Sequence, residues 1–141
     1  MRALSIRQPF AELILRGIKT VEYRSRPTRI IGEPFYIYAS KSGPRSGAAR
    51  QKIWSRDLAG GQPPARLLEL AEQVRLIEPE FNQHTFPTGV IVGQAVIERC
   101  VPLAAHGLAS PHYAWHLTHV ERAGQLRKPM RMPQPVWFSP F

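Results

Sequence analysis

Cysteine, acidic residues and long apolar runs are all scarce in this chain of 141 residues. Its one cysteine, Cys100, cannot form an internal disulfide, so we expect a reducing compartment and a small packed side chain rather than a catalytic thiol. No apolar run approaches the roughly 20 residues that span a bilayer, and the first residues do not resemble a secretory signal. These absences predict a cytoplasmic protein with no membrane partner.

The scarcity of acids is uneven along the chain. The formal net charge is +9, and residues 1–56 contain 12 lysines and arginines against three acidic residues. Residues 57–141 contain seven of each. A charge excess confined to one half is typical of a protein that meets a polyanion, although attraction to phosphate carries no sequence preference.

Short strands with few helices are expected along the chain. Short apolar, aromatic and β-branched runs predict strands at 3–6, 20–24, 35–39, 88–101, 113–117 and 136–138. Apolar residues at i, i+3, i+4 and i+7 predict a helix at 9–16. Gly89 and Gly93 in the long strand suggest the bends of a small barrel. We therefore predict an α+β fold, a small mixed β-barrel of five or six strands with flanking helices. Residues 1–141 form one domain in this prediction, with a basic helical insertion at about 44–78 that includes helices at 48–58 and 65–76.

The segment 17–24, Gly-Ile-Lys-Thr-Val-Glu-Tyr-Arg, is the most informative stretch. Gly17 follows an amphipathic run, as a helix C-cap does, because glycine enters the left-handed conformation without steric cost. On the strand that follows, Glu22 and Arg24 share one face, and Lys19 stands at the turn. These charges form either an ion pair on a strand surface or a binding site.

The residues 4–11, Leu-Ser-Ile-Arg-Gln-Pro-Phe-Ala, and the G-x-K-x-x-E-x-R pattern at 17–24 resemble the start of an ASCH (activating signal cointegrator homology) domain. Residues 86–93 are similar to the family's central strand, and 113–117 with 136–138 to its closing strands. The resemblance covers most of the chain and is weakest at 42–80. It implies the PUA-like fold and a function in nucleic-acid binding or processing.

The resemblance also raises an enzymatic alternative. Some small ASCH-type proteins are amidohydrolases of acylated cytidines, and others are reported as ribonucleases. The amidohydrolases use a lysine, a threonine three residues later and a glutamate on the central strand. Lys19 matches the lysine, but Glu22 occupies the threonine position and Val96 the position of the strand acid, with Glu98 two residues further on. The catalytic candidates are Lys19, Glu22 and Glu98, and whether the protein is an enzyme stays open.

Histidines and tryptophans add little to this interpretation. His112 and His116 have the i, i+4 spacing of a metal pair, but the segment looks like a strand and no third ligand is recognisable, so we expect neither metal nor cofactor. Trp54 lies among the basic residues of the insertion, where a ring suits stacking on a nucleobase, although anchoring of the insertion to the barrel explains it better.

We therefore predict a domain that binds RNA or single-stranded DNA in a basic cleft. A carboxylate inside such a cleft repels phosphate but accepts hydrogen bonds from a base edge. A hydrolase of the same fold and a protein-interaction module stay as alternatives. The residues predicted to contact nucleic acid are Gln8, Lys19, Glu22, Arg24, Arg26, Ser40, Lys41, Arg45, Arg50, Lys52 and Trp54.

Overall fold

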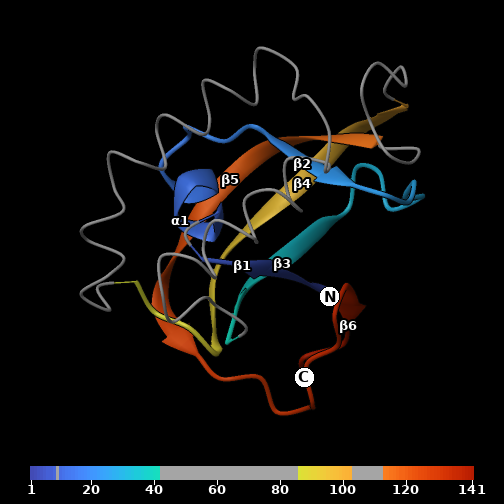
Figure 1. Cartoon of the computed structure of the whole chain (residues 1–141). Helices are drawn as coiled ribbons and strands as arrows, with labels where there is room; N and C mark the ends of the chain where they lie inside the picture. The colour runs from blue at the N-terminus through green and yellow to red at the C-terminus, as the bar shows by residue number, and fades with distance from the viewer. Residues whose placement is uncertain (9, 42–85, 103–112) are drawn as a thin grey trace, which may run out of the picture.

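In the part of the chain that the structure describes, a curled sheet of six strands carries one short helix, α1 (Figure 1). The computed structural model describes residues 1–8, 10–41, 86–102 and 113–141. In chain order the elements are β1 (Ala3–Arg7), α1 (Phe10–Leu15), β2 (Val21–Arg24), β3 (Pro34–Ser40), β4 (Val90–Pro102), β5 (Tyr113–Arg127) and β6 (Trp137–Phe138). None of the helices in these ranges is long and apolar enough to cross a membrane.

The sheet is mixed, with the strand order β2-β5-β4-β3-β1-β6. The strands β1 and β3 are parallel, and every other neighbouring pair is antiparallel. The sheet curls so far that Trp115 of β5 stacks on Trp137 of β6, with ring centroids 5.9 Å apart. Since β5 and β6 lie near opposite ends of the strand order, this contact confirms a small barrel-like fold. The flanking helices expected beyond α1 lie outside the described residues.

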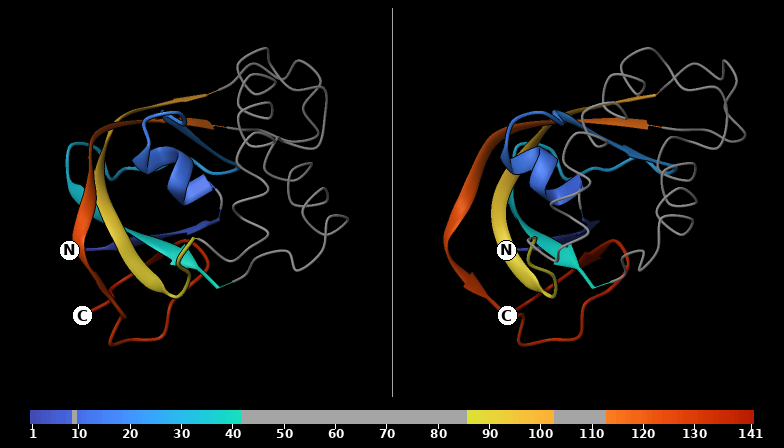
Figure 2. Two further views of the ribbon diagram at one scale, coloured as in Figure 1. Left: turned by 90° about the vertical axis from the view of Figure 1, so that its left-hand side faces the viewer. Right: turned by 60° about the vertical axis from the view of Figure 1, so that its left-hand side comes forward.

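The helix α1 lies on the concave side of the sheet (Figure 2), where Leu13 and Ile14 are fully buried. Gly93 of β4 is the reason that the helix can come so close. A Cβ atom there would lie 2.6 Å from the Leu15 side chain and 2.5 Å from the backbone oxygen of Glu121. A larger residue would therefore separate the helix from the sheet.

The predicted C-cap at Gly17 is confirmed. Its φ is +76°, and the amides of Gly17 and Ile18 donate to the carbonyl oxygens of Ile14 and Leu13, each at 3.0 Å. This pair of bonds is the Schellman arrangement, which satisfies the last carbonyls of a helix. The chain leaves α1 in a fixed direction, and that direction delivers Lys19 and β2 to the barrel.

One strand is much longer than predicted. Strand β5 continues ten residues past Leu117 to Arg127, through a polar stretch that lacks strand periodicity. It is held there by backbone pairing with β4, in which the register shifts three times. The other predicted strands are confirmed to within a few residues, whereas the helices predicted at 48–58 and 65–76 fall outside the described residues.

Candidate functional site

Lys19 is buried at the end of the α1–β2 turn, with only 5% of its surface exposed. Its Nζ donates a hydrogen bond of 2.7 Å to the backbone oxygen of Val21. The same atom lies 5.6 Å from the ring centroid of Phe10 and 5.3 Å from that of Tyr23. A carbonyl acceptor and two aromatic faces stabilise an ammonium ion. These contacts therefore suit a Lys19 side chain that keeps its positive charge better than one that acts as a nucleophilic amine.

Glu22 faces the interior of the curled sheet, because it pairs in register with the buried Trp115. The residue is 8% exposed. One carboxylate oxygen, Oε1, lies 3.6 Å from Nε of Arg24. The other, Oε2, is fully buried and has no hydrogen-bond partner among the described residues. Buried polar atoms nearly always have a partner, so this oxygen is a vacant acceptor inside a charged cluster.

Arg24 spans the opening between the two ends of the sheet. Its Nη2 donates to the backbone oxygen of Ser5 on β1 at 2.9 Å, although β1 and β2 are not neighbours in the strand order. Its guanidinium also lies 5.8 Å from the ring centroid of Trp115. Arg24 therefore contacts β1 and β5, and its guanidinium lies beside the carboxylate of Glu22. We call Lys19, Glu22 and Arg24 the β2 cluster.

A second group of predicted residues gathers at the turn before β4. Gln8 is 1% exposed, and its Nε2 donates to the backbone oxygen of Pro87 at 3.0 Å. Its Oε1 accepts from the amide of Glu12 at 3.0 Å, so the side chain caps the start of α1. Ser40 ends β3, and the exposed side chain of Lys41 lies over Gly89, where a Cβ would be 2.6 Å from its Cε.

The remaining predicted residues are dispersed. Arg26 is exposed, and its backbone oxygen accepts the indole N–H of Trp115 at 3.1 Å. Oε2 of Glu98 lies 3.6 Å from Nη1 of Arg99, and both side chains are 59% exposed. A solvated surface ion pair of this kind contributes little to stability. Arg45, Arg50, Lys52 and Trp54 lie outside the described residues.

No three metal-ligating side chains lie close together within the ranges that the structure describes. His116 lies half-buried on β5 opposite Arg99. Burial and the charge of Arg99 lower its pKa, and the charge of Glu98 partly opposes them. The imidazole is therefore predominantly neutral at pH 7, at the position of β5 that pairs with Val21 of β2.

Comparison with protein families shows which family the chain belongs to. The sequence profile of the ASCH domain matches residues 4–124, which include the cluster and the strands from β1 through most of β5. The chain belongs to the ASCH domain family. No curated protein matches its sequence significantly.

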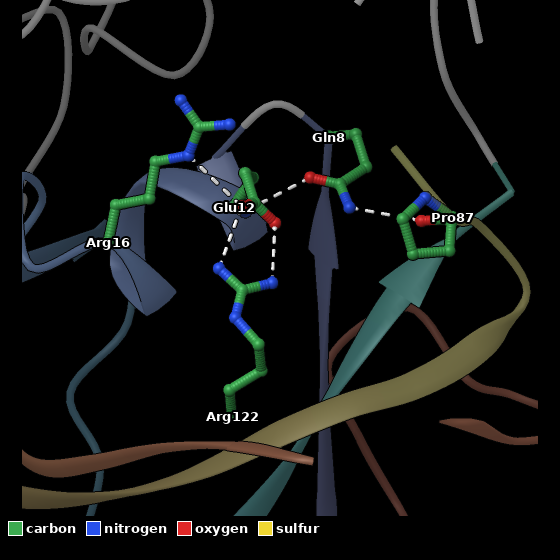
Figure 3. Close-up of polar contacts among 5 residues, drawn as sticks. All are labelled: Gln8, Glu12, Arg16, Pro87 and Arg122. Atoms are coloured by element: carbon green, nitrogen blue, oxygen red, sulfur yellow. Dashed lines mark hydrogen bonds and ion pairs between the residues drawn. The ribbon is translucent and has the colours of Figure 1, made fainter. Parts of the chain in front are cut away.

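This ASCH domain has a second buried carboxylate, which sequence reasoning missed (Figure 3). Glu12 of α1 is 6% exposed and accepts two hydrogen bonds from Arg122 of β5, at 2.8 and 3.2 Å. Nε of Arg16 donates a third, at 3.1 Å. The i, i+4 spacing could have predicted the bond from Arg16, but no sequence signal marks Arg122, 110 residues away.

The protonation of Glu12 reflects these partners. Burial by itself would raise the pKa of Glu12, but the hydrogen bonds and charges of Arg122 and Arg16 outweigh it and hold the pKa below its ordinary value of 4.5. The same bonds raise the pKa of Arg122. The carboxylate therefore stays ionised and attaches α1 to the sheet of the ASCH domain.

Proposed function

We propose that this ASCH domain binds RNA or single-stranded DNA and that the β2 cluster receives a nucleobase. The vacant acceptor of Glu22 carries the proposal. Leaving a buried carboxylate oxygen without a donor costs roughly 1–3 kcal/mol or more, so a ligand that supplies the donor recovers that free energy on binding.

The chemistry of the missing donor favours a base over a phosphate. A phosphate offers only acceptors to a carboxylate and is repelled by its charge, whereas amino and imino groups on a base edge donate hydrogen bonds. Single strands expose those edges, since their bases are not paired. Lys19 and Arg24 make the cluster positive overall, which suits a polyanion that brings one base inward.

The charge around the cluster supports the same partner. Lys41 and Arg26 are exposed, and the excess of basic residues lies in the half of the chain that contains the cluster. In this proposal the basic residues of the insertion, Arg45, Arg50 and Lys52, contact the phosphate backbone. Trp54 stacks on a nucleobase. These contacts supply affinity, and Glu22 supplies the preference among bases.

A hydrolase is the second candidate, because Lys19 and an acidic side chain lie in one buried cluster. The contacts of Lys19 argue against it as a nucleophile, and the exposed Glu98 lies in a solvated pair rather than in a buried site. We therefore expect little or no cleavage of N4-acetylcytidine. Turnover that disappears in Lys19→Ala would make the hydrolase the primary function.

Binding of fluorescent single-stranded homopolymers of A, C, G and U by anisotropy tests the proposal. Lys19→Ala should lower affinity for every sequence, because a cation is lost. Glu22→Gln should keep or raise the average affinity while discrimination among the bases shrinks, because a repulsive charge is gone and the amide adds its own donors. The control is Glu33→Gln, the same change at an exposed glutamate.

Two results would contradict the proposal. The first is equal loss of affinity in Lys19→Ala and Glu22→Gln together with a lowered melting temperature in both. Lys19 and Glu22 would then be a structural pair. The second is unchanged base preference in Glu22→Gln, which would place the nucleic acid elsewhere on the domain.

A further inference from the structure

The segment between β5 and β6, residues 128–135, displays two large apolar side chains that the fold does not use. Met130 is 84% exposed and Met132 is 81% exposed. Leu126, just before the segment, is 51% exposed. Isolated apolar residues are common on surfaces, but two unbranched thioether side chains raised on one loop are an accessible apolar feature. We call residues 128–135 the methionine loop.

The backbone of the methionine loop is anchored at both ends. The amides of Met130 and Arg131 donate to the backbone oxygen of Pro140, at 2.7 and 3.1 Å. Ser5 of β1 donates from its hydroxyl to the backbone oxygen of Gln134 at 2.5 Å. Three prolines, at positions 129, 133 and 135, further restrict the backbone. The methionines are thus presented on a preorganised backbone, which reduces the entropy lost when a partner binds.

The charge next to the methionines is of one sign. Residues 126–136 contain three basic residues and no acidic residue, and Lys128 and Arg131 are exposed within the loop itself. Arg127 is held just before the loop, where its guanidinium lies 4.5 Å from the ring centroid of Phe141 and 5.2 Å from that of Tyr36. The methionine loop therefore combines two exposed apolar side chains with a positively charged border.

We propose that the methionine loop is a docking surface for an acidic protein segment that carries apolar side chains. Methionine adapts its shape to varied apolar partners, and the basic border selects acidic ones. A nucleic acid would contact the basic side chains of the loop but not the two methionines. A membrane surface would gain only a small apolar contact area from two side chains. The loop begins at the end of β5 opposite to the end that pairs with β2. Its far end lies near the β2 cluster, because Ser5 donates to Gln134 of the loop and accepts from Arg24 of the cluster.

Binding of a short synthetic peptide in which glutamates alternate with leucines tests the proposal. Two double variants, Met130→Ser/Met132→Ser and Lys128→Glu/Arg131→Glu, should each weaken binding by about tenfold, the effect of losing an interface anchor. Their melting temperatures should stay at the wild-type value, because the altered side chains are exposed. Arg29→Glu, a charge reversal at an exposed arginine elsewhere, should leave the affinity for the peptide unchanged.

A second peptide, single-stranded RNA and phosphatidylserine vesicles distinguish an acidic apolar protein segment from a nucleic acid and from a membrane surface. A peptide with serine in place of leucine should bind at least fivefold more weakly than the glutamate–leucine peptide, because the methionines lose their apolar contact. Equal binding of both peptides, or wild-type affinity in the double methionine variant, would overturn the proposal. It would also be overturned if wild type does not bind the glutamate–leucine peptide, or if the double methionine variant reduces binding of single-stranded RNA or phosphatidylserine vesicles more than binding of the peptide.

Discussion

Glu12 and Glu22 are both buried carboxylates beside an arginine, and the difference between them separates structure from function in this domain. Three hydrogen bonds from Arg122 and Arg16 satisfy Glu12. Glu22 has one oxygen near Arg24 and one without a donor among the described residues. A satisfied buried acid rigidifies the fold, whereas a partly satisfied one costs stability and keeps binding capacity for a ligand.

The same substitution at both positions gives the largest expected contrast. Glu12→Gln replaces an ionised acceptor of three hydrogen bonds and should lower the free energy of unfolding by about 2 kcal/mol, the scale of hydrogen bonds to charged groups. Glu22→Gln keeps the volume and removes only an ion pair of 3.6 Å, so its effect should stay below about 1 kcal/mol.

Urea denaturation followed by tryptophan fluorescence measures both variants, and the oligonucleotide assay provides the second readout. Glu12→Gln should keep its preference among bases, and Glu22→Gln should lose it. If Glu22→Gln were the more destabilised protein, the β2 cluster would be the structural ion pair and the contrast would be wrong.

Acid should weaken the Glu12 attachment in a defined window. The pKa of Glu12 is lowered on folding, so its contribution to stability is complete above the ordinary value of 4.5 and is lost as pH falls through the lower value of the folded state. Arg122→Ala should therefore be less stable than wild type at pH 7. The difference should be only about 1 kcal/mol, less than for a fully buried charged hydrogen bond, because Arg122 is 53% exposed and solvent screens the pair. The difference should shrink below pH 4.5.

Unfolding of wild type and Arg122→Ala at several pH values measures this difference directly. The lowered pKa of His116 gives a separate loss of stability as pH falls below 6.5, but it affects both proteins and cancels in the subtraction. A difference that stays constant down to acid pH would show that Arg122 stabilises the domain by packing rather than through the charge of Glu12.

Local features of this fold could be predicted from the sequence. The C-cap at Gly17, the motif of the β2 cluster and most strands follow from residue types at short spacing. The burial of Gln8 was not foreseen, because its partners Pro87 and Glu12 are brought together only by the fold. Whether Gln8 also contacts nucleic acid stays a prediction.

Long-range features could not be predicted for a physical reason. The bonds between Glu12 and Arg122 depend on the register of β4 and β5, which shifts three times. The polar second half of β5 has no alternation of apolar residues from which that register could be predicted. No sequence pattern indicates that one carboxylate oxygen of Glu22 lacks a hydrogen-bond donor among the described residues. The lack arises because Arg24 reaches across to Ser5 and approaches only one of the two carboxylate oxygens.

The last prediction concerns Gly17, which joins the helix of Glu12 to the β2 cluster. Gly17 has φ of +76°, and a Cβ there would meet nothing within 4 Å. Gly17→Ala should therefore cost only the strain of the left-handed backbone, about 1 kcal/mol, and Gly17→Asn less, because asparagine tolerates that conformation. Base preference should persist in both, because Lys19 is anchored to Val21 and between two rings. A loss of binding in Gly17→Ala without further loss of stability would show that the cap, rather than these local contacts, positions Lys19.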